Sequence, residues 1–233
     1  MAFDSAWMAL TRFGNSGLML PAAGIVAAWL FVGRTRHAAG WSLALFVLAA
    51  GLVGASKIAF YGWGVGIRAV DFAGFSGHAM LASAVFPVAA YLFLPARLPR
   101  LRLAGAALGF AMGMAVGVSR VMVGAHSSSE AIAGCVLGAL VALAVMRLSS
   151  DHRRVDKRRV NDGGANTGGA LHGDRRRSSA RMQAWSAVPV LALLLLFAFG
   201  RPLNLDEYIV RLALVLSGHA QPVAREAWLA GGG

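Results

Sequence analysis

Six apolar segments divide this chain, and they constrain its fold more than any other feature of the sequence. They cover roughly residues 17–33, 41–60, 79–95, 103–118, 131–148 and 184–200. A helix of about 17–25 mainly apolar residues can cross a bilayer. In lipid every backbone polar group needs a partner within the protein, which favours helices. The segments therefore predict an all-α integral membrane protein, a helical bundle of about six transmembrane helices.

The composition agrees with a membrane protein and excludes other classes. The chain is 58% hydrophobic and only 14% charged, which makes it more apolar than a typical soluble domain. Its net charge is +12, but the basic residues form neither a face interleaved with aromatic side chains nor a known binding motif, so we expect no nucleic acid partner. The single cysteine, Cys135, excludes an intramolecular disulfide and a cysteine-based metal site.

A polar stretch, residues 149–182, interrupts the apolar pattern. It is basic and rich in glycine, and such a composition cannot bury a core, so we predict a disordered basic linker on the cytoplasmic side. The linker separates a five-helix membrane core, residues 1–148, from residues 183–233, which hold the sixth transmembrane helix and a tail. Four apolar residues of the tail recur at the spacing of an amphipathic helix, namely Leu205, Ile209, Leu212 and Leu216.

Glycines recur every four residues in the fourth apolar segment, at positions 105, 109, 113 and 117. Small residues at this spacing line one face of a helix and allow a neighbouring helix to approach closely. We interpret them as a packing stripe rather than as part of a site.

The basic residues predict how the chain is oriented. If the N-terminus lies outside the cytoplasm, the inner side receives 15 of the 22 Lys and Arg residues: Arg34, Arg36, Arg97, Arg100, Arg102 and the ten between Arg147 and Arg181. Cytoplasmic loops are enriched in Lys and Arg, so this orientation is favoured. Basic residues directly after the first apolar segment also argue against a cleaved signal peptide. We expect a bacterial inner-membrane protein whose polar motifs face the periplasm.

Two polar motifs lie beside the apolar segments. One is Phe75-Ser76-Gly77-His78, and the other runs from Ser119-Arg120 through His126 to Glu130. Ionisable groups are costly at membrane depth, so these motifs indicate a functional site. Arg68 and Arg120 offer planar forks of donors suited to phosphate. The free N–H groups of a helix that begins near Ser76 favour an anion as well.

His126 and Glu130 are four residues apart. In the first turn of a helix, the carboxylate of Glu130 can reach one imidazole nitrogen, fix the tautomer and raise the basicity of the other nitrogen. His126 can then act as a nucleophile or base, and His78 as the proton donor to a leaving group. Such a set suits phosphoryl transfer through a covalent histidine intermediate. The alternative interpretation treats the histidines as packing groups and the arginines as topology markers.

With these motifs the chain resembles the type 2 phosphatidic acid phosphatase (PAP2) superfamily over about residues 57–134. That family carries Ser-Arg, five residues, His, three residues and Asp, and a separate Pro-Ser-Gly-His. The resemblance implies that His126 forms a phosphohistidine, that Glu130 orients it and that His78 is the general acid. It implies further that phosphate oxygens are held by Arg120, Ser119, Ser76 and Gly77. Neither a metal nor a cofactor is expected.

This chain departs from the family pattern at three places. Glu130 stands where the family has Asp, and Phe75 stands where it has Pro. The family's first motif is Lys, six residues and Arg-Pro, whereas Lys57 here is followed by ten residues and then Arg68. Either Lys57 or Arg68 can serve as the phosphate ligand, and we favour Arg68. Asp71 can pair with either cation or remain a solvated loop acid.

The resemblance implies a membrane phosphatase that hydrolyses a lipid phosphate or diphosphate at the periplasmic face. The expected partners are the membrane and this lipid phosphate substrate. One alternative is a lipid phosphotransferase, in which another acceptor replaces water. The others are a small membrane transporter and a scaffold that keeps a phosphatase-like site. No feature of the sequence predicts an oligomeric state.

Overall fold

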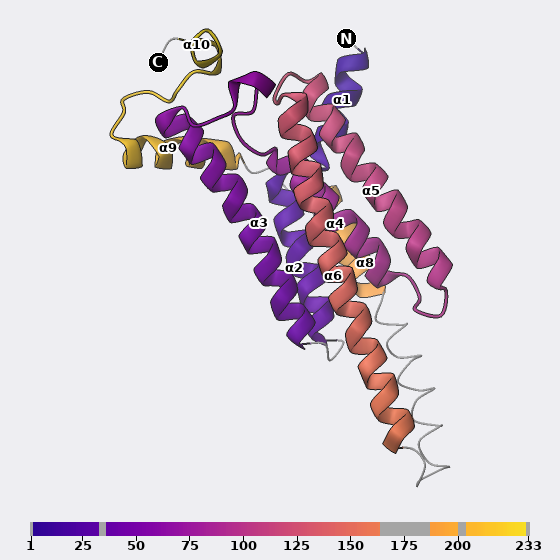
Figure 1. Cartoon of the computed structure of the whole chain (residues 1–233). Helices are drawn as coiled ribbons and strands as arrows, with labels where there is room; N and C mark the ends of the chain where they lie inside the picture. The colour runs from indigo at the N-terminus through magenta and orange to yellow at the C-terminus, as the bar shows by residue number, and fades with distance from the viewer. Residues whose placement is uncertain (1, 33–35, 164–186, 200–203, 232–233) are drawn as a thin grey trace.

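The computed structural model describes residues 2–32, 36–163, 187–199 and 204–231. Over these residues the chain is helical, as predicted, and the strand-like pairing among them is an isolated bridge between Ile67 and Phe72. In chain order the helices are α1 (Ala2–Arg12), α2 (Ser16–Val32), α3 (Arg36–Trp63), the 3-10 helix η1 (Arg68–Val70), α4 (Gly77–Phe93), α5 (Pro99–Met122), α6 (Ser128–Gly163), α8 (Ala187–Phe199), α9 (Leu205–Ser217) and α10 (Arg225–Leu229), as Figure 1 shows.

Four helical stretches among the described residues are long and apolar enough to cross a membrane: Ser5–Phe31, His37–Trp63, Pro99–Met122 and Ser128–Ser150. The other two predicted spans correspond to shorter apolar helices, Gly77–Phe93 and Val188–Ala198. At the usual rise per residue, the 17 residues of α4 extend only about 26 Å, less than a hydrocarbon core of about 30 Å. A membrane bundle is therefore supported, and the described residues contain four full-length spans, which leaves the predicted number of six unconfirmed.

The short helix α4 lies inside the bundle and contacts α2, α5 and α6. Its buried face is rich in small residues, and Ala79, Ala82 and Ala84 are fully buried. Lipid is as apolar as these side chains, so close contact between helices rather than exclusion from water stabilises such packing. The central position of α4 fixes the place of its first turn, which carries His78.

The glycines of α5 form the predicted packing stripe against α4. A Cβ atom on Gly109 would lie 2.5 Å from the backbone nitrogen of Pro87, and one on Gly113 would lie 2.6 Å from the Cα of Ser83. No side chain fits at such distances without a shift of the α4 backbone. The two helices therefore approach each other at positions that only glycine can occupy in this arrangement.

The predicted linker needs a correction at its start. We expected disorder from residue 149, but α6 continues to Gly163. The residues added to the helix include Arg and Lys, which have high helix propensity, and the helix ends at glycines, which disfavour its continuation. Polarity alone therefore indicated that this segment leaves the hydrophobic part of the bundle, not that it loses its helix. The remainder of the predicted linker, from residue 164, lies outside the described residues.

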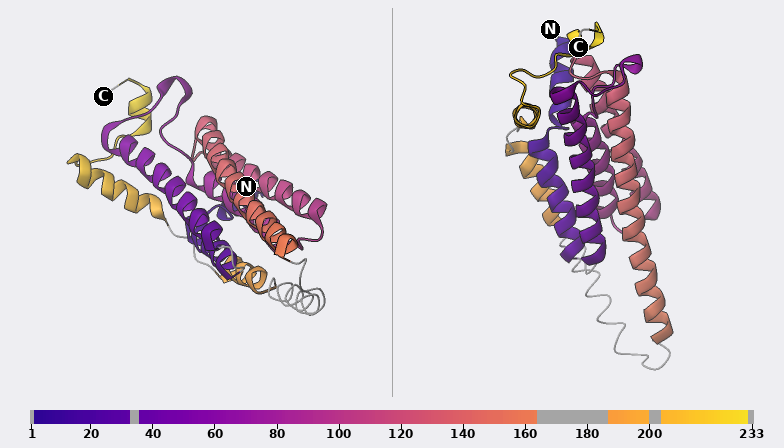
Figure 2. Two further views of the ribbon diagram at one scale, coloured as in Figure 1. Left: turned by 60° about the horizontal axis from the view of Figure 1, so that its bottom comes forward. Right: turned by 60° about the vertical axis from the view of Figure 1, so that its left-hand side comes forward.

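One end of the bundle gathers the segments that carry the polar motifs. Figure 1 shows the last turns of α3 and α5 and the first turns of α4 and α6 at the same end, together with α10. Helix α9 packs against α3, and Figure 2 shows that α6 extends far beyond the other described helices at the opposite end. The loop between α4 and α5, which contains Arg97, lies at that opposite end as well (Figure 1). The fold thus separates the polar motifs from this basic loop.

Candidate active site

Two loops bring the motifs together at this end of the bundle. The loop before α4 contains Asp71, which adopts a left-handed conformation with φ of 50°. The loop between α5 and α6 turns at Gly124, whose φ of 69° favours glycine. The backbone N–H groups of Ala125 and His126 both donate to the carbonyl oxygen of Arg120. This tight turn directs His126 back toward the first turn of α6.

His126 and Glu130 form the contact that their spacing predicted. The Nδ1 atom of His126 lies 2.7 Å from Oε2 of Glu130. The carboxylate is held from two further sides, because Oε1 accepts the N–H of Ala73 at 2.8 Å and Oε2 accepts the N–H of Ser127 at 3.2 Å. Glu130 is only 1% exposed. Since Nδ1 is engaged, Nε2 is the ring nitrogen that can act on a ligand.

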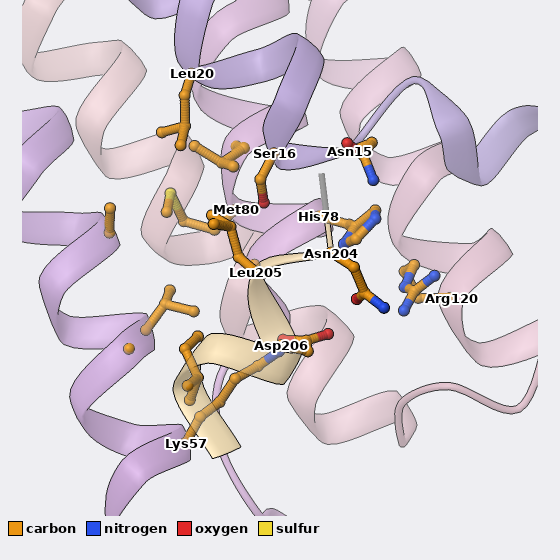
Figure 3. A pocket seen from close by; sticks show the side chains of 16 residues that line it. Asn15, Ser16, Leu20, Lys57, His78, Met80, Arg120, Asn204, Leu205 and Asp206 are labelled. Carbon is orange, nitrogen blue, oxygen red and sulfur yellow. The ribbon is translucent and has the colours of Figure 1, made fainter. Parts of the chain in front are cut away.

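Two adjoining cavities contain the predicted catalytic groups. His126 and Glu130 line a cavity of about 200 Å³, whereas His78 and Arg120 line one of about 440 Å³. Lys57 lines both cavities and thus marks the place where they meet. Figure 3 shows the side chains of His78 and Arg120 close together in the larger cavity. His78 reaches the larger cavity from the first turn of α4, and His126 reaches the smaller one from the loop before α6.

The larger cavity combines polar groups at one end with an apolar wall. Its polar lining includes Asn15, Ser16 and Asn204 besides the charged residues. The apolar wall comes from α2, α3, α4 and α9, and consists of Leu20, Ala50, Val53, Met80, Leu81, Leu205 and Ile209. Sites for small molecules are commonly lined in this way, with a few polar groups that orient the ligand.

Arg120 enters the larger cavity from the last turn of α5. Its Nη1 donates to the hydroxyl of Thr11 at 3.0 Å, so α1 holds one side of the guanidinium. Its buried Nε atom and the buried Oγ of Ser76 have no hydrogen-bond partner among the described residues. Gly77 lines the same cavity. These are the predicted phosphate ligands that the structure brings beside His78.

The structure places Lys57, rather than Arg68, at the cavities. Lys57 is 7% exposed, and its ammonium contacts the carboxylate of Asp206 at 2.5 Å. Arg68 is exposed, lines neither of these two cavities, and holds its guanidinium 5.6 Å from the ring of Trp228. The preference for Arg68 from the sequence thus does not match the geometry, because a 3-10 helix on the outer side of the loop directs this side chain away.

Ser119 lies in α5 with its hydroxyl bonded to the helix. Its Oγ donates to the carbonyl oxygen of Val116 at 2.6 Å, and the residue is fully buried. Ser119 lines neither cavity. In this structure it is therefore a helix residue beside Arg120 and not a direct ligand of the cavity.

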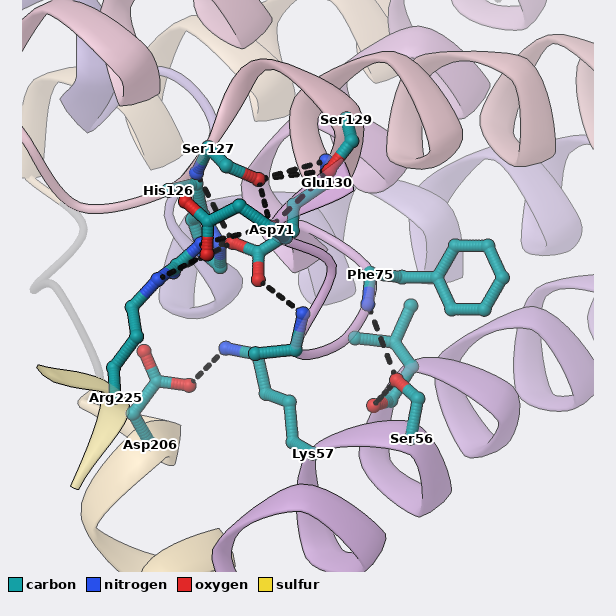
Figure 4. A network of polar contacts seen from close by, with 12 residues as sticks. Ser56, Lys57, Asp71, Phe75, His126, Ser127, Ser129, Glu130, Asp206 and Arg225 are labelled. Carbon is teal, nitrogen blue, oxygen red and sulfur yellow. Dashed lines mark hydrogen bonds and ion pairs between the residues drawn. The ribbon is translucent and has the colours of Figure 1, made fainter. Parts of the chain in front are cut away.

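The C-terminal segment contributes two site residues that sequence reasoning missed. Asp206 in α9 pairs with Lys57, and Arg225 at the start of α10 contacts both Asp71 and Glu130 (Figure 4). Asp71 thus pairs with neither of the two cations that the sequence suggested for it. The signal available in the sequence was the set of charges in the otherwise apolar tail, which we interpreted only as the polar face of an amphipathic helix.

Three ionisable groups of the site, His126, Asp206 and Arg225, lie outside the membrane-spanning helices. Burial lowers the pKa of the His126 imidazole by more than its hydrogen bond to Glu130 raises it, so the ring is neutral at neutral pH. Burial alone would raise the pKa of Asp206, but the charge and hydrogen bond of Lys57, together with the two histidines, hold this pKa below its usual value. Burial would lower the pKa of Arg225, but the hydrogen bond to Asp71 and the charge of Glu130 raise it instead.

The part of the chain that the structure describes contains no obvious set of ligands for a metal ion. No group of three or more His, Cys, Asp or Glu side chains there could hold a metal ion. Three cations, Lys57, Arg120 and Arg225, line the cavities beside the two carboxylates of Asp206 and Glu130, and such cations suit an anionic ligand.

Comparisons with known proteins agree with the motifs. Residues 69–154 match the family model described as the PAP2 superfamily. An uncharacterised 22.5 kDa protein in the cps region of Klebsiella pneumoniae is 40% identical over 134 residues, which cover 57% of this chain and 64% of the relative. The match therefore spans less than two thirds of that relative. No solved structure matches. The match confirms the resemblance seen in the motifs, and the family suggests a phosphatase-type activity.

Proposed function

We propose, from the match of residues 69–154 to the PAP2 superfamily, that this chain is a membrane phosphatase that removes a phosphate from a lipid phosphate or diphosphate. The observation that carries the proposal is the contact of His126 with the buried carboxylate of Glu130, in a cavity that Lys57 also lines. The carboxylate fixes Nδ1, which leaves Nε2 free for attack. A cation beside this nitrogen attracts the oxygens of a phosphoryl group.

The proposed reaction has two steps. First, Nε2 of His126 attacks phosphorus, so that an N–P bond forms while the bond from phosphorus to the lipid oxygen breaks, and His78 donates a proton to that oxygen. A water molecule then attacks the phosphohistidine, the N–P bond breaks, and orthophosphate leaves. The proton released by this water returns to His78, which restores the starting state.

Cations and backbone donors hold the phosphate oxygens in this proposal. Lys57 and Arg120 line the larger cavity together with Gly77, at the start of α4, where backbone N–H groups favour an anion. The buried Nε of Arg120 is without a partner among the described residues, and a phosphate oxygen would satisfy it, whereas Ser76 is fully buried and lines neither cavity. Lys57 becomes available when its contact with Asp206 opens.

The apolar wall of the larger cavity supports a lipid as the substrate. Leu20, Val53, Leu81 and Ile209 lie in the same cavity as Lys57 and His78. A head group can therefore reach the cations while its hydrocarbon stays against apolar side chains. We place this site at the periplasmic face, because the basic residues between Arg147 and Arg159 follow the span Ser128–Ser150 at its far end from the site.

The test is phosphate release by the purified chain in detergent, with a panel of dioctanoyl phosphatidic acid, dioctanoyl phosphatidylglycerol phosphate and a short prenyl diphosphate. His126→Ala should lower turnover by roughly 10⁴-fold or more, because the covalent step is lost. During turnover of a ³²P-labelled substrate, wild-type protein should carry an acid-labile, base-stable label on the peptide that contains His126.

A matched control is His219→Ala, since His219 is an exposed tail histidine that bonds to the carbonyl of Gly62. This variant should retain turnover. Full turnover by the His126→Ala variant would contradict the mechanism. Appearance of the label on an added acceptor lipid instead of in orthophosphate would identify a phosphotransferase, and transport without phosphate release would favour a transporter.

A further inference from the structure

We infer that Arg225, from the C-terminal segment, is a positioning residue that orients Glu130 and through it the imidazole of His126. The inference rests on the proposed function, because it assigns a task within the same site. Arg225 lies outside the family match, which ends at residue 154, and no predicted motif includes it. Figure 4 shows its side chain extending from the start of α10 into the group formed by His126, Glu130 and Asp71.

The contacts of Arg225 join the two loops of the site. Its Nη1 donates to Oε2 of Glu130 at 3.2 Å, which is the oxygen that also contacts Nδ1 of His126. Its Nε and Nη2 lie 3.0 Å and 2.8 Å from Oδ1 of Asp71, and Nη2 donates to the carbonyl oxygen of Asp71 at 3.0 Å. The fork of a guanidinium is thus used to hold a buried carboxylate against a loop.

These contacts favour a positioning role over direct binding of phosphate. Each of the three nitrogens of the Arg225 guanidinium already donates to Asp71 or Glu130, so most of its five N–H groups are engaged although the residue lines the smaller cavity. A phosphate ligand must keep donors for the substrate, as the unpartnered Nε of Arg120 does. The charge of Arg225 also offsets that of Glu130, which limits how strongly Glu130 attracts a proton to the imidazole.

The packing of α10 explains why Arg225 is held in place. Trp228, one turn further along α10, is 4% exposed and meets the ring of Phe60 edge to face at 5.2 Å. The N–H of Val223 donates to the carbonyl oxygen of Tyr61 at 2.9 Å. Arg68 lies against the outer side of the Trp228 ring. The tail segment is therefore anchored on α3 and the neighbouring loop, so that Arg225 approaches Glu130 from a fixed support.

The backbone carbonyl of Asp71 links Arg225 to α6 as well. The carbonyl oxygen of Asp71 accepts hydrogen bonds from the hydroxyls of Ser127 and Ser129 at 2.6 Å and 3.3 Å. Arg225 therefore contacts a loop that is already tied to the first turn of α6. Loss of the guanidinium would release Glu130 on the side opposite Ala73, and the carboxylate would then be held less firmly against His126.

The first experiment measures the pKa of His126 without using the phosphatase activity. The rate at which diethylpyrocarbonate modifies the peptide containing His126 is followed by mass spectrometry as a function of pH in wild type, Arg225→Gln, Arg225→Lys and Asp71→Asn. Removing the charge of Arg225 leaves Glu130 less compensated, so Arg225→Gln should raise the pKa of His126 by about half a unit or more. Arg225→Lys keeps the charge and should restore most of the wild-type value.

The second experiment uses turnover of dioctanoyl phosphatidic acid. Arg225→Gln should lower kcat by roughly 10-fold or more and change KM by less than about 3-fold, with the acid limb of the kcat/KM profile moved to higher pH. Asp71→Asn should give a smaller change in the same direction. The matched control Arg211→Gln removes a charge from the exposed face of α9 and should leave kcat, KM and the profile unchanged.

The outcomes separate the inference from the proposed function. An unchanged pKa of His126 in both Arg225→Gln and Asp71→Asn would overturn the positioning role, and so would a change in KM alone. If Arg225→Gln does not fold, Asp71→Asn and Arg225→Lys carry the same comparison. A shifted pKa in a chain without any phosphatase activity would support the contact network and count against the proposed function only.

Discussion

Glu130 shows at the scale of a single residue how a longer acid can fill a place where the PAP2 pattern has Asp. Its two oxygens divide their contacts, because Oε1 accepts the N–H of Ala73 and Oε2 meets His126, Ser127 and Arg225. The extra methylene lets one carboxylate contact the loop before α4 and the histidine after α5 at the same time. The departure from the family pattern is therefore matched by local contacts.

The prediction at this scale concerns the charge and the length of Glu130. Glu130→Gln keeps the shape but removes the charge that fixes the His126 tautomer, so kcat should fall by roughly 10²–10⁴-fold. Glu130→Asp keeps the charge and should retain far more activity than Glu130→Gln. Initial rates with dioctanoyl phosphatidic acid measure both, and equal activity of Glu130→Gln and wild type would remove Glu130 from the mechanism.

Local spacing was enough to predict the pair of His126 and Glu130, because His126 lies just before α6 and Glu130 lies in its first turn. The choice between Lys57 and Arg68 was not predictable in this way. Lys57 is directed toward the cavities by its place on α3, whereas Arg68 is directed outward by η1 and contacts Trp228. Arg225 is 95 residues away from Glu130 in sequence, and no local pattern in the sequence predicts a contact between residues so far apart.

At the scale of an element, α9 covers the larger cavity. Leu205 and Ile209 contribute to its apolar wall, and Asp206 reaches the ammonium of Lys57. The spacing of the leucines predicted the helix, which spans Leu205–Ser217. The sequence did not reveal which surface it would meet. A carboxylate and a phosphate are both anions. Asp206 therefore pairs with Lys57, the cation that the phosphate of the proposed substrate needs.

The prediction at this scale is that Asp206 competes with the phosphate group. Asp206→Asn removes the competing charge, and KM for dioctanoyl phosphatidic acid should fall by roughly 3- to 10-fold, given that the pair is partly exposed. Glu207→Gln is the matched control, because Glu207 is exposed and bonds to Asn204 rather than to Lys57. An increase in KM for Asp206→Asn would show that Asp206 supports binding instead.

At the scale of the whole molecule, the bundle keeps its site and a basic loop at opposite ends (Figure 1). The apolar segments predicted the helical bundle, and among the described residues α4 is shorter than a full span. A segment that begins at a polar motif inside the protein need not match the thickness of the bilayer, so apolar length alone does not fix the number of spans. The helical extension of α6 shows likewise that a polar composition does not exclude regular structure.

The prediction at this scale concerns the side of the membrane that the site faces. In a Cys135→Ala background, Ala125→Cys at the exposed turn beside His126 should react with an impermeant maleimide on intact cells. Ala96→Cys, in the exposed loop at the opposite end, should react only after permeabilisation. The reverse pattern would place the site on the cytoplasmic side and would contradict the orientation that the basic residues predict.

The contact of Arg225 with Glu130 has a consequence for the biosynthesis of the protein. A nascent chain that has been inserted as far as α6 already contains both histidines, Glu130, Lys57 and Arg120. It still lacks the guanidinium that holds Glu130 and the anchor at Trp228, until the ribosome has added these residues and they have reached the same side of the membrane. Assembly of these contacts therefore waits for the tail, and a prematurely terminated chain would keep every family motif without the contacts of Arg225.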